Sequence, residues 1–233
     1  MICRRRKFLL ECLIVVGVIF LTFNAEGRKM LVPTDEEVIK LPSVPKRGQW
    51  TLEEVMLKRA SVREFSREPL TLQDISSLLW AAQGTTRPWG ARTAPSAGAL
   101  YPLEIYLVLP PGVFHYEPKH HKLVRHMRGN VISALAQAAL GQGCVRNAPG
   151  VIVICAVYER TSRKYGARAE RYVKIEVGHA AQNVLLQATS MGLGAVPVGA
   201  FYDDKVKEVL NLPSDHEPLY LVPVGYPEKD GRP

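Results

Sequence analysis

Several motifs that define common enzyme classes are missing from the 233 residues of this chain. The sequence contains no CxxC pair and no HExxH, GxSxG or GxxxxGK[ST] segment. These absences argue against a structural zinc site, a zinc protease, an α/β-type serine hydrolase and a P-loop nucleotide site. The six histidines show no tight ligand spacing either, so no metal site is predicted.

Cysteine is scarce, and basic runs of the nucleic-acid-binding type are absent beyond residue 27. Cys3 and Cys12 lie near the N-terminus, Cys144 lies in an expected loop, and no disulfide framework is predicted. Cys155 lies in the apolar run 151–157 and is expected to be a buried small side chain. The net charge is nevertheless +8, an excess that suits an anionic ligand or an acidic surface rather than nucleic acid.

The first 27 residues have the order of an export signal. Residues 1–7 are basic, residues 12–23 are apolar, and polar residues follow. The apolar run is shorter than the roughly 20 residues that a membrane span needs. Residues 5–9 (RRKFL) resemble a twin-arginine signal, and the alternatives are an ordinary basic leader and an uncleaved anchor. We therefore expect export to the periplasm or cell envelope, with membrane contact only through this segment.

The remaining chain is predicted to hold a proline-rich linker, 28–49, and one domain, 50–233. Periodic apolar residues with terminal signals predict helices at 51–60, 71–84, 130–141, 169–191 and 203–210. Short apolar runs predict strands at 104–109, 113–116, 123–126, 151–157 and 219–224. This order favours an α+β fold over regular βαβ alternation. Gly178, inside the longest helix, is a candidate for a close approach by another segment.

Two segments have residue types that bind phosphates or planar ligands. Arg59, Ser61 and Arg63 follow the first predicted helix and can supply charge-assisted donors to a phosphate. A solvated basic turn is the alternative. The small residues of 94–102 (APSAGALYP), with the Ser96 hydroxyl, would let a planar ligand approach the backbone, and a packed structural turn is the alternative.

Two further segments could bind a ring or move a proton. Segment 192–201 (GLGAVPVGAF) follows a helix and lacks the glycine spacing of a dinucleotide fingerprint, but its backbone amides could bond a ring nitrogen. Lys164 beside Tyr165 offers two groups whose pKa values respond to burial and mutual proximity, as proton transfer requires. An exposed basic loop is the alternative for this pair.

The order of these segments along the chain resembles one protein family. The segments 59–65 (RASVREF), 95–108 (PSAGALYPLEIYLV), 164–188, 192–201 and 221–227 (LVPVGYP) closely resemble the nitroreductase superfamily, nearest its SagB-type dehydrogenase branch. The resemblance covers residues 50–228. It implies an α+β fold with a central, mostly antiparallel sheet flanked by helices, and a homodimer with FMN at the subunit interface.

The same resemblance implies roles for individual residues. The first group would contact the phosphate, ribityl chain and polar edge of FMN: Arg59, Ser61 and Arg63, with Lys229 and Arg232 assisting the phosphate. A second group would line the flavin: Pro95, Ser96, Ala97 and Gly98. A third would direct backbone amides towards flavin N5: Pro197, Val198, Gly199 and Ala200. Lys164 and Tyr165 would handle the substrate proton.

The implied activity is FMN-dependent oxidoreduction of a small organic molecule. Electrons would pass through flavin N5 in two separate steps, with NAD(P)H as a candidate donor. One alternative is a SagB-type dehydrogenase that oxidises an azoline-like substrate with Lys164 and Tyr165 as acid and base. The other is a flavin-binding protein without turnover.

Overall fold

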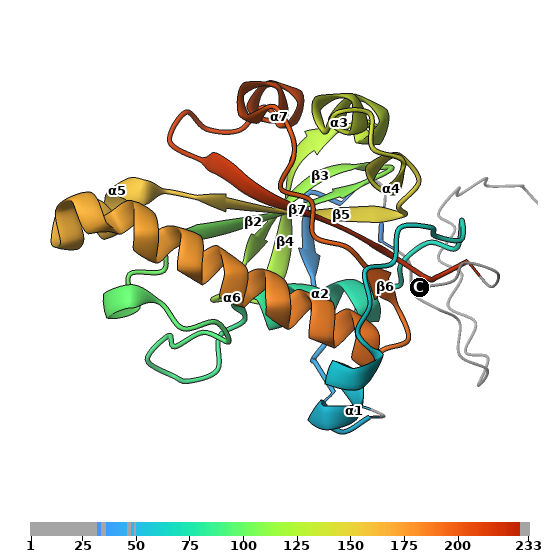
Figure 1. Cartoon of the computed structure of the whole chain (residues 1–233), viewed down its shortest axis with the longest axis horizontal. Helices are drawn as coiled ribbons and strands as arrows, with labels where there is room; N and C mark the ends of the chain where they lie inside the picture. The colour runs from blue at the N-terminus through green and yellow to red at the C-terminus, as the bar shows by residue number, and fades with distance from the viewer. Residues whose placement is uncertain (1–31, 34–35, 46–47, 49, 229–233) are drawn as a thin grey trace, which may run out of the picture.

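One seven-stranded sheet organises the described part of the chain. The computed structural model describes residues 32–33, 36–45, 48 and 50–228. The strand order is β1-β4-β3-β2-β5-β7-β6, all six pairings are antiparallel, and helices cover both faces (Figure 1). This arrangement confirms the predicted α+β class with a mostly antiparallel central sheet.

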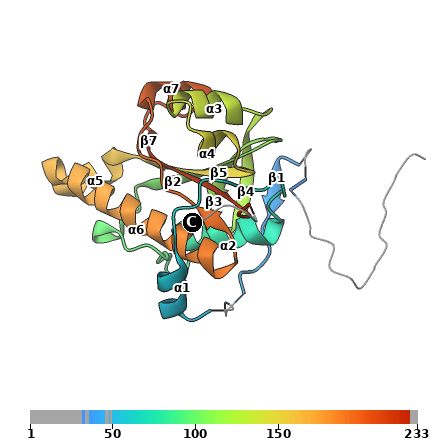
Figure 2. The ribbon, with the colours of Figure 1, turned by 45° about the vertical axis from the view of Figure 1, so that its right-hand side comes forward.

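The strands are β1 (Val38–Lys40), β2 (Leu103–Leu109), β3 (Gly112–Glu117), β4 (Lys122–Arg128), β5 (Gly150–Ala156), β6 (Gly194–Ala195) and β7 (Glu217–Gly225). β2, β3 and β4 form the predicted meander. All residues of β5 are buried between β2 and β7, as its continuous apolar run predicts. β1 comes from the segment predicted to be a linker and pairs with β4 at the sheet edge (Figure 2).

The helices are α1 (Leu52–Lys58), α2 (Leu72–Gln83), α3 (Ile132–Ala138), α4 (Gly143–Arg146), α5 (Tyr158–Tyr165), α6 (Ala169–Ser190) and α7 (Asp203–Leu210), with 3-10 turns η1 (Ala97–Ala99) and η2 (Gly166–Arg168). Capping boxes start two of them. The hydroxyls of Thr51 and Thr71 accept from the backbone N–H groups three residues on, and the carboxylates of Glu54 and Asp74 accept in return. Such local signals explain why these two starts were predictable.

Three details differ from the sequence-based predictions. The helix predicted at 130–141 ends at Ala138, because Leu140 and Gly141 adopt left-handed backbone angles, with φ of 58° and 73°. Cys144, expected in a loop, lies in the short helix α4. The close approach predicted at Gly178 is not made by the described residues, since none of them lies within 4 Å of where its β-carbon would be.

Each face of the sheet has its own apolar core. Successive residues of β5 alternate between them, since side chains along a strand point to opposite faces. Ile152 and Ile154 pack in the core covered by α2 and α6, whereas Val151 and Val153 pack in the core covered by α3, α4 and α7 (Figure 1). The predicted apolar stripe of α6 is buried throughout: Val173, Val177, Ala180, Ala181, Val184, Leu185 and Ala188.

Cys144 and Cys155 are free thiols in buried positions. Searching the described residues finds no helix both long and apolar enough to cross a membrane. The same part of the chain holds no group of three His, Cys, Asp or Glu side chains that could bind a metal ion. Packing around the sheet is therefore the main source of stability that the structure shows.

Candidate functional site

Two segments that are each predicted to contact the cofactor lie next to each other. Past α1 the chain is extended, and the N–H of Val62 donates to the carbonyl of Ala195 at 3.1 Å. Ser61 and Ala195 form an isolated parallel bridge. A β-carbon on Gly194 would lie 2.5 Å from the Val62 side chain, so the close approach depends on glycine at this position. The two segments thus pack together at 61–62 and 194–195, and we call residues 59–63 and 194–200 the first cradle.

The side chains of the first cradle form a cationic donor set. Arg59 and Ser61 are partly exposed, and Arg63 is exposed with its Nη1 donating to the Ser61 carbonyl at 3.4 Å. In the described chain neither arginine forms an ion pair with a carboxylate. Two uncompensated guanidinium groups beside a hydroxyl are well suited to bind a phosphate or another anionic group.

Backbone donors complete the first cradle. Val198 is fixed by two hydrogen bonds with Leu221, of 2.8 and 3.0 Å, and the Ala200 carbonyl accepts from Nε2 of Gln142 at 2.8 Å. Gly199 and Ala200 are exposed, and across the described residues their N–H groups have no hydrogen-bond acceptor. Of the predicted segment 197–200, only these two amides are therefore available to a ligand, because Pro197 has no N–H and that of Val198 donates to Leu221.

A second cradle forms where the 95–98 segment meets the end of α5. Gly98 has a φ of +63°, and a β-carbon on it would lie 2.8 Å from Oη of Tyr165 and 3.1 Å from Nζ of Lys164. Tyr165 also packs edge-on against Tyr172 of α6, with ring centroids 5.0 Å apart. The structure thus brings the predicted acid/base pair to the predicted flavin-lining segment. The basic stretch around Lys164 is helical rather than a loop.

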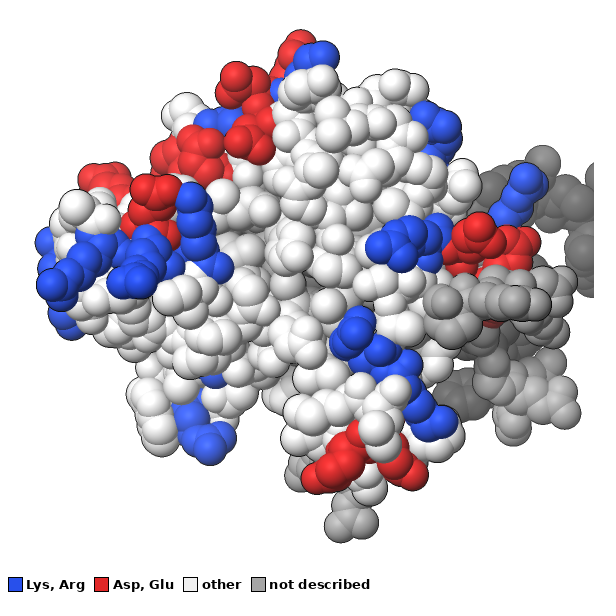
Figure 3. Space-filling model, in the orientation of Figure 1, with Lys and Arg blue, Asp and Glu red and all other residues white. Residues whose placement is uncertain are grey.

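Positive charge gathers beside the second cradle. Figure 3 shows Lys and Arg side chains over α5 and the first turns of α6. Arg163 is paired with Glu159, and Lys174 with Glu170, one helical turn away in each case. Lys164, which is exposed, has no such carboxylate partner among the described residues. Its ammonium group is therefore available to a substrate.

A buried polar cluster beneath the second cradle escaped sequence analysis. Glu176 on α6 is only 2% exposed, and its carboxyl group faces Ser96, Gln83 and Arg92. Burial raises the pKa of Glu176 to about 7, although the Ser96 and Gln83 side chains and the charge of Arg92 each oppose the rise. Oε1 of Glu176 and Nε2 of Gln83 have no hydrogen-bond partner in the described part of the chain.

A sequence signal for Glu176 did exist. It lies three residues after Val173 and four before Ala180, on the stripe of α6 that is otherwise apolar. A carboxylate at such a position must be buried, and buried carboxylates are often functional. For Arg92 no comparable signal exists, because it lies in an irregular segment and its partner Gln83, whose Oε1 accepts from Nη1 at 2.9 Å, is in another element.

The remaining predicted residues are less well placed. In the described chain no hydrogen bond or ion pair joins the first cradle to the second. Lys229 and Arg232 lie outside the described residues. A groove of about 1200 Å³ between α1, α2 and α6 contains none of the predicted site residues.

The comparison with known proteins identifies the family. The family model of the nitroreductase family matches residues 56–226 of this chain. The chain belongs to the nitroreductase family. It is 49% identical to a nitroreductase of Methanocaldococcus jannaschii over 197 residues, 82% of this chain and 97% of the relative. A nitroreductase structure from Ralstonia eutropha superposes with a TM-score of 0.77 at 32% identity, covering 86% of this chain and 94% of the other.

A more distant relative is the microcin B17-processing protein of Escherichia coli. The identity is 28% over 158 residues, which is 63% of this chain and 58% of that protein. The family match and these relatives support the conclusion that the chain is a flavin-using oxidoreductase. They do not assign a role to any single residue of the two cradles, so those roles stay predictions.

The described residues of this family member fit a flavin mononucleotide. Its phosphate requires cations and hydroxyl donors, which Arg59, Ser61 and Arg63 can supply from one edge. Its ring system requires donors at a close approach, which the unengaged amides of Gly199 and Ala200 provide. The donor chemistry of the first cradle therefore agrees with the cofactor that the sequence predicts.

Proposed function

We propose that the protein binds FMN and catalyses oxidoreduction of a small organic molecule in two separate half-reactions. The observation that carries the proposal is the packing of residues 61–62 against 194–195, because it joins a segment with two uncompensated arginines and a serine hydroxyl to a segment with two free backbone amides. When bound, FMN supplies the redox chemistry, because N5 can accept a hydride from a donor and deliver it to an acceptor.

The residues of the chain bind and orient this group. Arg59 and Ser61 hold the phosphate and ribityl chain, and Arg63 lies towards the pyrimidine edge, where its charge stabilises negative charge on the ring. The amides of Gly199 and Ala200 donate towards N5. The small residues of 95–98 leave the ring face accessible, either in the same subunit or across a dimer.

The direct test is the absorption spectrum of the purified protein, with mass analysis of the flavin released by heat. We expect FMN. Arg59→Ala and Arg63→Ala should each raise the FMN Kd about tenfold or more, since each removes a charge-assisted hydrogen bond. Arg128→Ala is the matched control, because Arg128 is an exposed arginine paired with Glu37 at the β1–β4 edge of the sheet. Colourless protein that does not bind added FMN would refute the proposal.

The electron donor is tested by anaerobic mixing with NADH, NADPH and dithionite. We propose NAD(P)H as the donor, so either nicotinamide should bleach the visible absorption band of the flavin. Bleaching by dithionite alone would favour a different donor or a flavin-binding protein without turnover. In both cases the FMN site itself would stand.

A second candidate function is dehydrogenation of an azoline-like substrate. Two observations favour it: Lys164 and Tyr165 both lie beside Gly98, and a relative is named as a microcin-processing protein. Here the deprotonated form of Tyr165 or Lys164 would accept the substrate proton, and a bound flavin would supply the oxidising power. Lys164→Ala and Tyr165→Phe should keep FMN and lose turnover. Full turnover in both variants, with Arg163→Ala as control, would dismiss this function.

We also propose that the active form is a homodimer with small-molecule substrates only. Large apolar side chains are exposed on α1 (Leu52, Met56 and Leu57), where Leu52 lines the groove, and on α6 (Ile175). Exposed apolar patches of this kind often mark interfaces. Light scattering should give twice the chain mass, and Leu57→Lys with Met56→Lys should shift it to the monomer. Retained dimers would contradict this interface.

We also propose that the protein is exported, with residues 1–27 as the export signal. Residues 1–27 lie outside the described residues, so the proposal depends on the basic and apolar order of the sequence alone. Cell fractionation should place the protein in the periplasm or envelope. Replacing Arg5 and Arg6 by Lys should block this if the twin-arginine route is used, and leave it unchanged if it is not.

A further inference from the structure

The segment that follows the second cradle has an unfavourable backbone conformation. Ala99 and Tyr101 both have positive φ, 54° and 46°. Residues other than glycine avoid positive φ, because their β-carbon then crowds the following carbonyl oxygen. Tyr101 is further restricted by Pro102, which follows it directly. Strain of this kind persists only where surrounding contacts hold it, and it is concentrated at functional sites.

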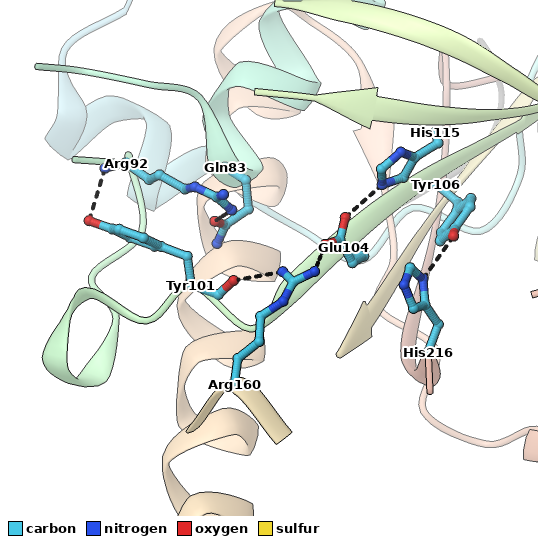
Figure 4. A network of polar contacts seen from close by, with 8 residues as sticks. All are labelled: Gln83, Arg92, Tyr101, Glu104, Tyr106, His115, Arg160 and His216. Carbon is cyan, nitrogen blue, oxygen red and sulfur yellow. Dashed lines mark hydrogen bonds and ion pairs between the residues drawn. The ribbon is translucent and has the colours of Figure 1, made fainter. Parts of the chain in front are cut away.

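Every polar group of Tyr101 has a partner, and Figure 4 shows the partners of its carbonyl and hydroxyl groups. Its N–H donates to Oγ of Ser96 at 2.9 Å, and its carbonyl accepts from Nη1 of Arg160 at 3.1 Å. Its hydroxyl accepts from the backbone N–H of Arg92 at 3.3 Å, and the Arg92 side chain contributes through its guanidinium, which lies 4.7 Å from the ring centroid. Two arginines from different segments thus hold one strained residue.

Arg160 is itself fixed by the sheet. Its Nη2 donates to Oε1 of Glu104 on β2, and Oε2 of Glu104 bonds Nε2 of His115 on β3 at 2.6 Å. Burial alone would raise the pKa of Glu104, but the bond to His115 and the charge of Arg160 lower it to about 2. The carboxylate therefore stays ionised over the physiological pH range, and its hold on Arg160 is permanent.

Arg92 is fixed by the end of α2. Its Nη1 donates to Oε1 of Gln83, which is fully buried, and Glu176 of α6 lies close enough to interact with its charge. Tyr101 is consequently held from the sheet side through Arg160 and from the helix side through Arg92. Its bond to Ser96 transmits both constraints directly into the 95–98 segment.

We propose that Arg160 and Arg92 are positioning residues that hold Tyr101 in its strained conformation and thereby fix the 95–98 segment against the flavin. This inference rests on the proposed function, which places 95–98 at the cofactor. Neither arginine needs to touch FMN, because each acts through Tyr101. The expected benefit is a preorganised surface, so that binding FMN does not require the loop to become ordered.

The first test measures the loop before any FMN is added. Arg160→Met removes the guanidinium but keeps an apolar side chain, and Arg163→Met on the same helix is the matched control, since Arg163 pairs only with exposed Glu159. Hydrogen–deuterium exchange in the peptide containing 95–101 should become at least tenfold faster in R160M and stay unchanged in R163M. Unchanged exchange in R160M would overturn the inference.

The second test adds FMN. R160M should raise the FMN Kd about tenfold and alter the visible circular dichroism of the bound flavin, while R163M leaves both unchanged. Faster exchange with an unchanged Kd and spectrum would show a merely structural role and overturn the positioning claim. A wild type that binds no FMN would refute the proposed function instead. The exchange result would still show whether Arg160 holds the 95–101 segment in place.

A milder variant keeps the test decisive if R160M does not fold. Glu104→Gln retains the shape of the side chain but removes the charge that holds Arg160. Tyr101→Phe removes only the acceptor for the Arg92 N–H. Each should raise the FMN Kd about threefold and speed exchange in 95–101. If both variants match the wild type in Kd and exchange, the inference is wrong.

Discussion

The hydroxyl oxygen of Tyr165 lies 2.8 Å from the point that a β-carbon on Gly98 would occupy. No real β-carbon tolerates such a contact, so any side chain at position 98 must displace Tyr165 or its own loop. Nζ of Lys164 is almost as close, at 3.1 Å. The predicted acid/base pair and the predicted flavin-lining segment therefore share one tightly packed position.

This packing predicts that Gly98→Ala impairs the site specifically. Alanine at a φ of +63° costs about 1–2 kcal/mol of stability, and its methyl group also displaces Lys164 and Tyr165. We expect weaker FMN binding and slower turnover. Gly90→Ala is the control, since Gly90 also has a positive φ, +90°, but nothing within 4 Å among the described residues. Equal effects of the two variants on FMN Kd would show that the contact with Tyr165 is irrelevant.

The first cradle depends on another glycine. A β-carbon on Gly194 would lie 2.5 to 2.9 Å from three atoms of the Val62 side chain. Gly194→Ala should therefore separate 59–63 from 194–200, lowering stability by about 1–3 kcal/mol through overpacking and weakening FMN binding. Val62→Ala in the same chain should restore part of both losses, because it removes the colliding methyl groups.

A double-mutant cycle makes this prediction quantitative. Stability and FMN Kd are measured for G194A, V62A and the double variant, and the coupling energy should be about 1 kcal/mol or more for residues in direct contact. Strictly additive effects would mean that the two segments do not depend on each other.

The sequence predicted the fold well where the signals are local. The capping boxes at Thr51 and Thr71, the buried run of β5 and the apolar stripe of α6 each lie within one element, so their patterns can be read directly. The edge strand β1 could not be predicted, because three residues with one buried side chain carry no periodic signal. Its pairing with β4 depends on a contact between segments that are far apart in the sequence.

The site was predictable in part for a similar reason. The segments around Arg59, Ser96, Lys164 and Gly199 could be predicted as candidates because their residue types have recognisable chemistry and a recognisable order. Arg92 and Arg160 were missed, because their function depends on contacts with Tyr101 that only the folded chain brings together. Ordinary arginines in polar segments give no sign that they hold a strained backbone.

The buried thiol of Cys155 should be chemically inert in the folded protein. Its side chain is fully buried on β5, and burial strongly raises its pKa, so that the reactive thiolate is scarce at pH 8. Iodoacetamide followed by peptide mapping should label Cys155 only after denaturation. Burial also raises the pKa of Cys144, but the Val145 backbone and the charge of Arg63 oppose the rise, so Cys144, at 8% exposure, should react somewhat faster. Rapid labelling of native Cys155 would contradict its position in the core.

Glu176 should make stability depend on pH in an unusual direction. Its pKa rises from an ordinary value of 4.5 to about 7 in the folded chain, because burial disfavours the carboxylate. Between these values the folded protein keeps a proton that the unfolded chain releases, so the free energy of unfolding falls as pH rises. The contribution is fully present below pH 4.5 and lost above pH 7. Its size is about 3 kcal/mol at most, at 1.36 kcal/mol per pKa unit.

Glu176→Gln should remove this dependence, since an amide does not titrate. The free energy of unfolding from urea titrations, taken as variant minus wild type, should increase as pH rises from 4.5 to 7. Glu170→Gln on the same helix is the control, because the bond to Lys174 lowers the pKa of Glu170 and moves its titration below this window. Wild-type and E176Q curves that run parallel from pH 4.5 to 7 would show that Glu176 is ionised throughout, with Arg92 and Ser96 compensating its burial.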